Sequence, residues 1–192
     1  QHGVAIGAHP AYPDLVDFGR RPMYLSAEEI IASLHYQIAA LDGMANCQQL
    51  QLSYVKPHGA LYNDMMAKVE VRSAIMQAVA SYHRPIALML QATPELDSHR
   101  REAESFGLAL LFEAFADRCY DDDGKLLSRS RPGAVHDRDK MLAQVEQLQR
   151  EGTVTTLSGK LIELRADTLC VHGDNLEGVQ AIEAIRALVD GN

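Results

Sequence analysis

The sequence has 192 residues, of which 47% are hydrophobic and 23% are charged, which is typical of a soluble globular protein. Disordered, collagen-like and disulfide-scaffold proteins are excluded by this composition. The 18 basic and 26 acidic residues give a formal net charge of −8. This charge argues against nucleic acid or a membrane surface as a partner, because both require a basic surface. No apolar run approaches the roughly 18 residues that a membrane span needs.

The cysteines and the first residues bear on the cellular location. Cys47, Cys119 and Cys170 are odd in number and have no CxxC spacing, which favours a reducing compartment over a disulfide-linked fold. The sequence starts without the basic and apolar segments of a signal peptide. We therefore expect a cytoplasmic protein.

Short apolar runs alternate with longer amphipathic segments along the chain. The runs that predict buried strands are, in chain order, 4–8, 52–55, 86–90, 108–112 and 168–171. Continuous apolar runs are typical of parallel strands covered on both faces. The repeated alternation of strand and helix predicts a parallel α/β fold, and it leaves a doubly wound sheet and a (β/α) barrel both open.

The helices between these strands are expected from their boundary signals. The first is expected to begin with the Ser26–Glu29 capping box and to end at Gly43. The second is capped by Asn63 or Asp64 and carries 66–79, and the third begins at Thr93-Pro94. The fourth covers 137–151 and is ended by Gly152, and the last runs from Asn175 to Val189. Segment 114–135 has much charge and little apolar periodicity, so it is expected to be a long functional or disordered loop.

Polar residues that could carry chemistry follow the predicted strands. Because the carboxyl ends of parallel strands share one edge of the sheet, we expect an active site at that edge. The candidates are His9, Asp14 and Arg20 after the first strand, Lys56, His58 and Asn63 after the second, Glu113, Asp117 and Arg118 after the fourth, Arg129 and Arg131 in segment 114–135, and His172 and Asp174 after the last.

Four of these residues suit a catalytic role. Lys56 and His58 are presented together by a rigid Lys-Pro-His-Gly turn, and a desolvated lysine can act as a base or hold an anion. His172 and Asp174 suit either a base with its orienting carboxylate or a pair of metal ligands. Asp174 fits the capping of the last helix equally well.

The remaining candidates suit substrate binding. Arg118, Arg129 and Arg131 are predicted to clamp an anion, since arginine binds carboxylate or phosphate with two hydrogen bonds. A plain surface ion pair would explain Asp117 and Arg118 equally well. GxSxG, P-loop and GxGxxG motifs are absent from the sequence, so ATP binding by this chain alone is not predicted.

Five blocks of the sequence, in order, resemble the LamB/YcsF family, to which the 5-oxoprolinase A subunit (PxpA) belongs. They are Gly-Ala-His-Pro-Ala-Tyr-Pro-Asp at 7–14 with Phe18-Gly19-Arg20, Val-Lys-Pro-His-Gly-Ala-Leu-Tyr-Asn at 55–63, Glu-Ala-Phe-Ala-Asp-Arg-Cys-Tyr at 113–120, Ser-Arg-Ser-Arg-Pro-Gly-Ala at 128–134, and Val-His-Gly-Asp at 171–174. Together they span nearly the whole chain.

The resemblance implies one domain over 1–192, a (β/α) barrel of the seven-stranded, polysaccharide-deacetylase-like type. It also implies cleavage of 5-oxo-L-proline (pyroglutamate) to L-glutamate, coupled to ATP hydrolysis. The partners, 5-oxoprolinase subunits B and C, would bind ATP and phosphorylate the lactam, and this chain would open the ring. Family members begin with Asn-Ala-Asp-Leu-Gly-Glu and Gly-Phe-His-Ala-Gly-Asp blocks that this sequence lacks. The N-terminal part of the family domain is therefore expected to be missing from it.

Ring opening requires water attack on the carbonyl carbon, a base and oxyanion donors. We expect His58, His172, Lys56 and Asp174 to be catalytic, with Lys56 stabilising the oxyanion or a phosphate. The expected substrate-binding residues are His9, Asp14, Arg20, Asn63, Glu113, Asp117, Arg118, Arg129 and Arg131.

Two alternative functions remain open. One is a metal-dependent, deacetylase-like hydrolase that holds a divalent ion between His9, His58, His172 and a carboxylate. The other is a non-catalytic subunit of a complex. In the main interpretation no metal ligand is assigned, and an oligomer is compatible with the sequence.

Overall fold

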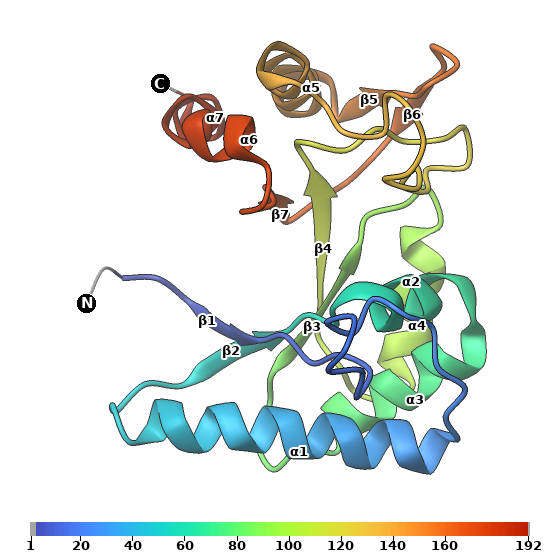
Figure 1. The fold of residues 1–192 in the computed structure, drawn as a ribbon, viewed down its shortest axis with the longest axis vertical. Coiled ribbons are helices and arrows are strands. Elements are labelled where there is room, and N and C mark those ends of the chain that lie inside the picture. The colour runs from blue at the N-terminus through green and yellow to red at the C-terminus, as the bar shows by residue number, and fades with distance from the viewer. Residues whose placement is uncertain (1–2, 192) are drawn as a thin grey trace. The chain divides into compact units, whose positions relative to one another are not determined.

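The computed structural model describes residues 3–191, and its helices and strands alternate in the predicted way (Figure 1). The strands are β1 (Ile6–Ala8), β2 (Leu52–Val55), β3 (Ala87–Gln91), β4 (Leu110–Phe115), β5 (Thr153–Thr155), β6 (Leu161–Glu163) and β7 (Thr168–Cys170). The helices are α1 (Ala27–Asn46), α2 (Gly59–Ala67), α3 (Val69–Ala80), α4 (Leu96–Glu104), α5 (Arg138–Glu151), α6 (Leu176–Gln180) and α7 (Ile182–Asp190).

The chain forms two compact units. Unit 1 comprises Gln1–Leu90 and Asp97–Leu111, and unit 2 comprises Gln91–Leu96 and Phe112–Asn192. Among residues 3–191, no helix combines the length and the apolar character required to cross a lipid bilayer.

Unit 1 is built on parallel strands, and α1 packs against β1 and β2. β1 pairs in parallel with β2, placing Ala8 opposite Val55, and β2 pairs in parallel with β3. The α1 side chains Ile30, Leu34 and Ile38 recur every four residues, so they form one buried stripe. This stripe faces the core of the unit, and α1 lies alongside α3 (Figure 1).

Unit 2 pairs β4 with β7 in parallel, with Phe115 opposite Cys170. Ala116, Val145, Ala181 and Ile185 form a buried cluster that joins the end of β4 to α5 and α7. The hairpin of β5 and β6 packs beside α5 (Figure 1). Parallel strands connected through helices in each unit confirm the predicted α/β class.

Several helix boundaries confirm the sequence signals. Ser26 accepts a hydrogen bond from the Glu29 backbone N–H, and Glu29 accepts one from the Ser26 N–H, which completes the predicted capping box of α1. Asp137 caps α5 through the Lys140 N–H, and Gly152 ends it in the left-handed conformation, with φ of 66°.

Two boundaries in unit 1 differ from the prediction. α1 continues past Gly43 to Asn46, because Ala45 on the next turn is buried and extends the apolar stripe. Neither Asn63 nor Asp64 caps a helix, since α2 already begins at Gly59 after the Lys-Pro-His turn. Asp64 instead lies within α2 and accepts a hydrogen bond from the Tyr12 hydroxyl, at 2.8 Å.

The other differences concern short elements. α4 begins at Leu96, after a turn in which Leu96 N–H donates to the Thr93 carbonyl, so Thr93-Pro94 precedes the helix. The last helix is broken at Ala181 into α6 and α7. The β5–β6 hairpin was not predicted, because each of its strands has only three residues and carries little apolar pattern.

Candidate active site

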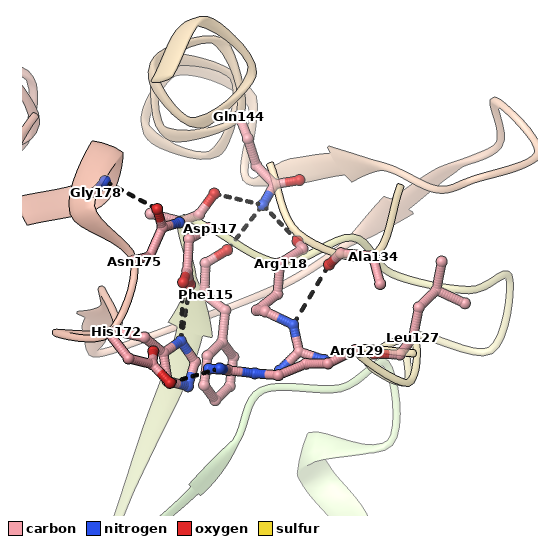
Figure 2. Close-up of polar contacts among 12 residues, drawn as sticks. Phe115, Asp117, Arg118, Leu127, Arg129, Ala134, Gln144, His172, Asn175 and Gly178 are labelled. Atoms are coloured by element: carbon pink, nitrogen blue, oxygen red, sulfur yellow. Dashed lines mark hydrogen bonds and ion pairs between the residues drawn. The ribbon is translucent and has the colours of Figure 1, made fainter. Parts of the chain in front are cut away.

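An aspartate and a histidine meet at the carboxyl ends of β4 and β7. Phe115 lies opposite Cys170 in the parallel pairing, so Asp117 and His172, each two residues further on, occupy equivalent places. His172 Nδ1 lies 3.0 Å from both carboxylate oxygens of Asp117 (Figure 2). The two side chains therefore form a dyad, although 55 residues separate them in the sequence.

The electrostatics of this dyad favour a proton acceptor at His172. Burial of the Asp117 carboxyl would raise its pKa, but the hydrogen bond and charge of His172, with Asn175, hold the pKa below its usual range. An ionised carboxylate only accepts hydrogen bonds, so His172 carries its proton on Nδ1. With Nδ1 bound to Asp117, Nε2 is the nitrogen that can exchange a proton with the solvent, and 27% of the side chain is exposed. This nitrogen can take a proton from water.

The His172 ring is fixed by its neighbours as well as by Asp117. The Phe115 ring stacks against it with centroids 5.6 Å apart and planes 18° from parallel. Asn175, which begins α6, accepts a hydrogen bond from the Gly178 N–H, as predicted for a helix cap. The side chains of Asp117 and Phe115 therefore hold the ring. A hydrogen bond from the Asn175 side chain, at the start of α6, helps to lower the pKa of Asp117.

Asp174, the carboxylate predicted to orient His172, forms an ion pair with Arg129, with Oδ2 2.8 Å from Nη1. The carboxylate seen to hydrogen-bond His172 Nδ1 is that of Asp117, which the strand register places beside it. The catalytic role of Asp174 stays a prediction. Both partners of the Arg129–Asp174 pair are about half exposed, so the pair adds little to stability.

Arg118 faces the protein rather than the solvent. Its Nη2 donates to the Leu127 carbonyl and its Nε to the Ala134 carbonyl at 3.4 Å. Burial and the nearby Arg129 lower the pKa of its guanidinium. Arg118 therefore organises segment 114–135, which folds back on itself through bridges at Arg118–Val135 and Tyr120–Leu126. Arg131, further along this segment, is exposed, whereas Glu113 in β4 is buried.

Unit 1 brings two predicted histidines together at the ends of β1 and β2. His9 Nε2 lies 3.0 Å from His58 Nδ1. The outer nitrogens bind backbone carbonyls: His9 Nδ1 that of Lys56 at 2.6 Å, and His58 Nε2 that of Phe18 at 3.0 Å. The turn that presents Lys56 and His58 therefore places these histidines in one hydrogen-bonded chain.

The charge of this histidine pair follows from its hydrogen bonds. Carbonyl oxygens only accept, so both outer nitrogens carry protons, and the nitrogen–nitrogen contact requires a third proton between the rings. Two neutral imidazoles supply two protons. A hydrogen bond between the two rings would therefore require one proton more than two neutral imidazoles carry.

Three other candidates in unit 1 have different surroundings. Asp14 is buried and accepts two hydrogen bonds from the Arg21 guanidinium, at 2.6 and 3.2 Å, which lower the pKa of the Asp14 carboxyl. This ion pair closes the loop after β1. The Arg20 guanidinium carbon lies 5.8 Å from the centroid of the Phe18 ring. Asn63 is exposed on α2.

Within the part of the chain that the structure describes, no group of three or more His, Cys, Asp or Glu side chains is arranged to hold a metal ion. The metal-dependent alternative therefore stays a prediction. The chemistry that the units supply is acid–base and electrostatic, with a carboxylate-oriented imidazole in unit 2 and a pair of imidazoles in contact in unit 1.

Comparison with known proteins places the chain among its relatives. A family model described as the LamB/YcsF family matches residues 1–192. The chain belongs to the LamB/YcsF family. The family suggested by the five sequence blocks is thereby confirmed.

Curated members of the LamB/YcsF family are about half identical to this chain. One, named as the A subunit of 5-oxoprolinase, from Pseudomonas fluorescens (strain Pf0-1), is 50% identical over 186 residues, which are 96% of this chain and 74% of the relative. Another of the same name, from Chromohalobacter salexigens, is 50% identical over 192 residues, which are 100% of this chain and 77% of the relative. The chain thus spans about three quarters of their lengths.

A solved structure shares the fold. The crystal structure of Lactam Utilization Protein from Thermus thermophilus superposes with a TM-score of 0.87 and 39% sequence identity. The match covers 99% of this chain and 75% of the other. This likeness confirms the α/β fold implied by the LamB/YcsF resemblance.

Several residues around the candidate site in unit 2 were not predicted from the sequence, because Phe115, Gln144 and His136 received no role. Gln144 had a detectable signal, since it interrupts the apolar stripe of α5 between Met141 and Val145 and is nevertheless buried. A polar side chain on an apolar helix face requires hydrogen-bond partners in the fold.

Proposed function

We propose that this chain, as the A subunit of 5-oxoprolinase, catalyses the hydrolytic opening of 5-oxo-L-proline to L-glutamate. The observation that carries the proposal is the Asp117–His172 dyad, in which the buried carboxylate binds His172 Nδ1 and leaves Nε2 as the nitrogen that can exchange a proton. The names of the relatives, which are a 5-oxoprolinase subunit and Lactam Utilization Protein, supply the substrate class, a cyclic amide.

The proposed reaction begins with water at the lactam carbonyl. His172 Nε2 takes a proton as the water oxygen bonds to the carbonyl carbon, and the Asp117 carboxylate stabilises the imidazolium that forms. The carbon–nitrogen bond then breaks, and the ring nitrogen takes up the proton to become the amine of glutamate. The protein must also stabilise the charge that develops on the carbonyl oxygen.

Positively charged side chains of each unit, taken by itself, are proposed to bind anions. In unit 1, Lys56 and the His9–His58 pair suit an oxyanion or phosphate. In unit 2, Arg129 is proposed to bind the substrate carboxylate, since its exposed pairing with Asp174 is weak and exchangeable. Arg118 is not proposed for substrate binding, because its guanidinium already donates hydrogen bonds to backbone carbonyls. Asp14 is not proposed either, because its carboxylate already binds the Arg21 guanidinium.

ATP and partner subunits complete the proposal. The relatives are named as subunits, which supports a complex. We propose that subunits B and C bind ATP and transfer its terminal phosphoryl group to the lactam oxygen, with release of ADP. The water attack and carbon–nitrogen cleavage on this chain then leave an acyl phosphate of glutamate, from which a second water releases phosphate. The sequence lacks the common nucleotide-binding motifs, which is consistent with ATP binding on the partners. We further propose that the complex works in the cytoplasm.

The test is glutamate release from 5-oxo-L-proline and ATP by the protein that carries this chain, combined with subunits B and C. His172→Ala is expected to lower kcat by at least about 10²-fold, because general base catalysis contributes that much or more. The matched control is His83→Ala, which removes a largely exposed histidine of unit 1 and is expected to leave kcat unchanged. A loss of less than about threefold in His172→Ala would reject the base and favour a non-catalytic role in the complex.

A further inference from the structure

A buried glutamine on α5 holds the backbone that carries Asp117. Gln144 is only 7% exposed. Its amide nitrogen donates to the carbonyls of Phe115, Ala116 and Arg118 at 2.8, 3.2 and 3.0 Å (Figure 2). One side chain therefore binds the residues on both sides of Asp117.

These contacts determine the course of the chain after β4. The pairing of β4 with β7 continues only as far as the Ala116 N–H, which donates to the Cys170 carbonyl. The carbonyls of Phe115, Ala116 and Arg118 bind Gln144. The Asp117 carbonyl accepts a hydrogen bond from the His136 N–H at 3.0 Å. In Figure 2 the Gln144 amide and the His172 ring lie on opposite sides of this segment, and the Asp117 carboxylate points to His172.

His136 determines which way the amide of Gln144 faces. Its Nε2 lies 3.2 Å from Gln144 Oε1. Burial lowers the pKa of His136, so its ring is neutral, and a neutral ring that binds a carbonyl oxygen must donate from Nε2. The Gln144 oxygen is thereby directed to His136, and both amide hydrogens are left for the carbonyls of segment 115–118.

We propose that Gln144 is a positioning residue, which holds the Asp117 carboxylate in the geometry that keeps the His172 proton on Nδ1. The catalytic part of this inference rests on the proposed function, whereas the effect on the tautomer of His172 does not. Three related replacements would not meet the requirement at this position. Asparagine is one methylene shorter, an ionised glutamate has no donor, and an apolar side chain leaves the carbonyls without the amide.

The test compares two substitutions on the same helix. Gln144→Met keeps the approximate size and removes the amide donors. Gln147→Met is the matched control, because Gln147 binds Thr153 and Thr155 of β5 instead of the carbonyls of segment 115–118. Nitrogen-15 NMR of the histidine rings reports the tautomer of His172, and glutamate release reports kcat.

The expected result is a changed tautomer together with a loss of activity. The unsubstituted protein and Gln147→Met should both show His172 protonated on Nδ1. Gln144→Met should show a mixture of tautomers and a kcat lowered by about 10²-fold, since a displacement of about 1 Å in a catalytic group has that effect. An unchanged tautomer and kcat, with only lower thermal stability, would overturn the proposal.

A second variant covers the case in which Gln144→Met does not fold. His136→Phe leaves Gln144 in place but removes the donor that orients its amide, so the same change of tautomer is expected with a smaller loss of kcat, about tenfold. An unaltered His172 spectrum in His136→Phe would then reject the inference. A changed spectrum combined with full activity of His172→Ala would reject the proposed function and keep the positioning role.

Discussion

His172 and His58 show how the same side chain is placed among different hydrogen-bond partners. A buried carboxylate binds one nitrogen of His172 and leaves the other for chemistry. His58 has a carbonyl on one nitrogen and a second imidazole on the other. The first arrangement suits a base that alternates between neutral and charged, and the second suits a lasting positive charge.

The charge of the histidine pair can be counted directly. We expect nitrogen-15 NMR at neutral pH to find three protons on the four ring nitrogens of His9 and His58, because two carbonyls and one nitrogen–nitrogen contact each require one. His9→Asn should return the His58 ring to a neutral form that titrates alone. A count of two protons, or spectra altered by a metal chelator, would contradict the shared proton.

At the scale of the element, α2 begins where the turn after β2 meets the loop after β1. Gly59 has a φ of 59°, and a Cβ placed there would lie 2.5 Å from the Gly19 carbonyl oxygen. That oxygen accepts the Ala60 N–H at 3.0 Å, so the close approach is part of the bonding between the two segments. Only glycine satisfies both the backbone conformation and the space.

Substitution of two glycines separates these requirements. Gly107 has a similar φ of 64°, and a Cβ added there would meet nothing within 4 Å. Gly107→Ala is therefore expected to lower the free energy of unfolding by about 1 kcal/mol through backbone strain alone. Gly59→Ala adds a clash with the Gly19 backbone and is expected to lower the free energy of unfolding by about 3 kcal/mol. Urea unfolding of both variants checks this, and equal losses would show that the contact with Gly19 is relaxed without cost.

At the scale of the whole molecule, buried ionisable groups in both units link stability to pH. In unit 1, hydrogen bonds from Arg84 lower the pKa of the Asp42 carboxyl against the effect of its burial. In unit 2, Asp117 also has a lowered pKa, because the His172 interactions outweigh its burial. Burial lowers the pKa of His136. In each case the unfolded chain binds protons more readily than the folded one.

Stability is therefore expected to fall on acidification. The His136 contribution is complete above the unfolded pKa of about 6.5 and declines as the pH falls below it. The contributions of Asp42 and Asp117 persist to the unfolded pKa of about 3.9 and are lost as the pH falls further, through their folded values. Urea midpoints measured from pH 8 to pH 3 test this. His136→Phe should flatten the curve between about pH 7 and 5, and a midpoint that rises on acidification would contradict the assignment.

Local signals in the sequence accounted for most of the elements. The capping box at Ser26, the cap at Asp137 and the left-handed Gly152 depend on residues within one helical turn, so their spacing predicts them directly. The parallel strands were predicted because strands covered on both faces read as continuous apolar runs. The β5–β6 hairpin and the break at Ala181 carry no such signal.

The sequence by itself therefore determined the α/β class and the family, and it located polar candidates directly after the strands. Which of those residues meet within each unit was decided only by the tertiary structure. The register of β4 and β7 brings His172 to Asp117, and α5 brings Gln144 to segment 115–118. The reason is physical: capping and periodicity act over a few residues, whereas strand register and buried hydrogen bonds join segments tens of residues apart.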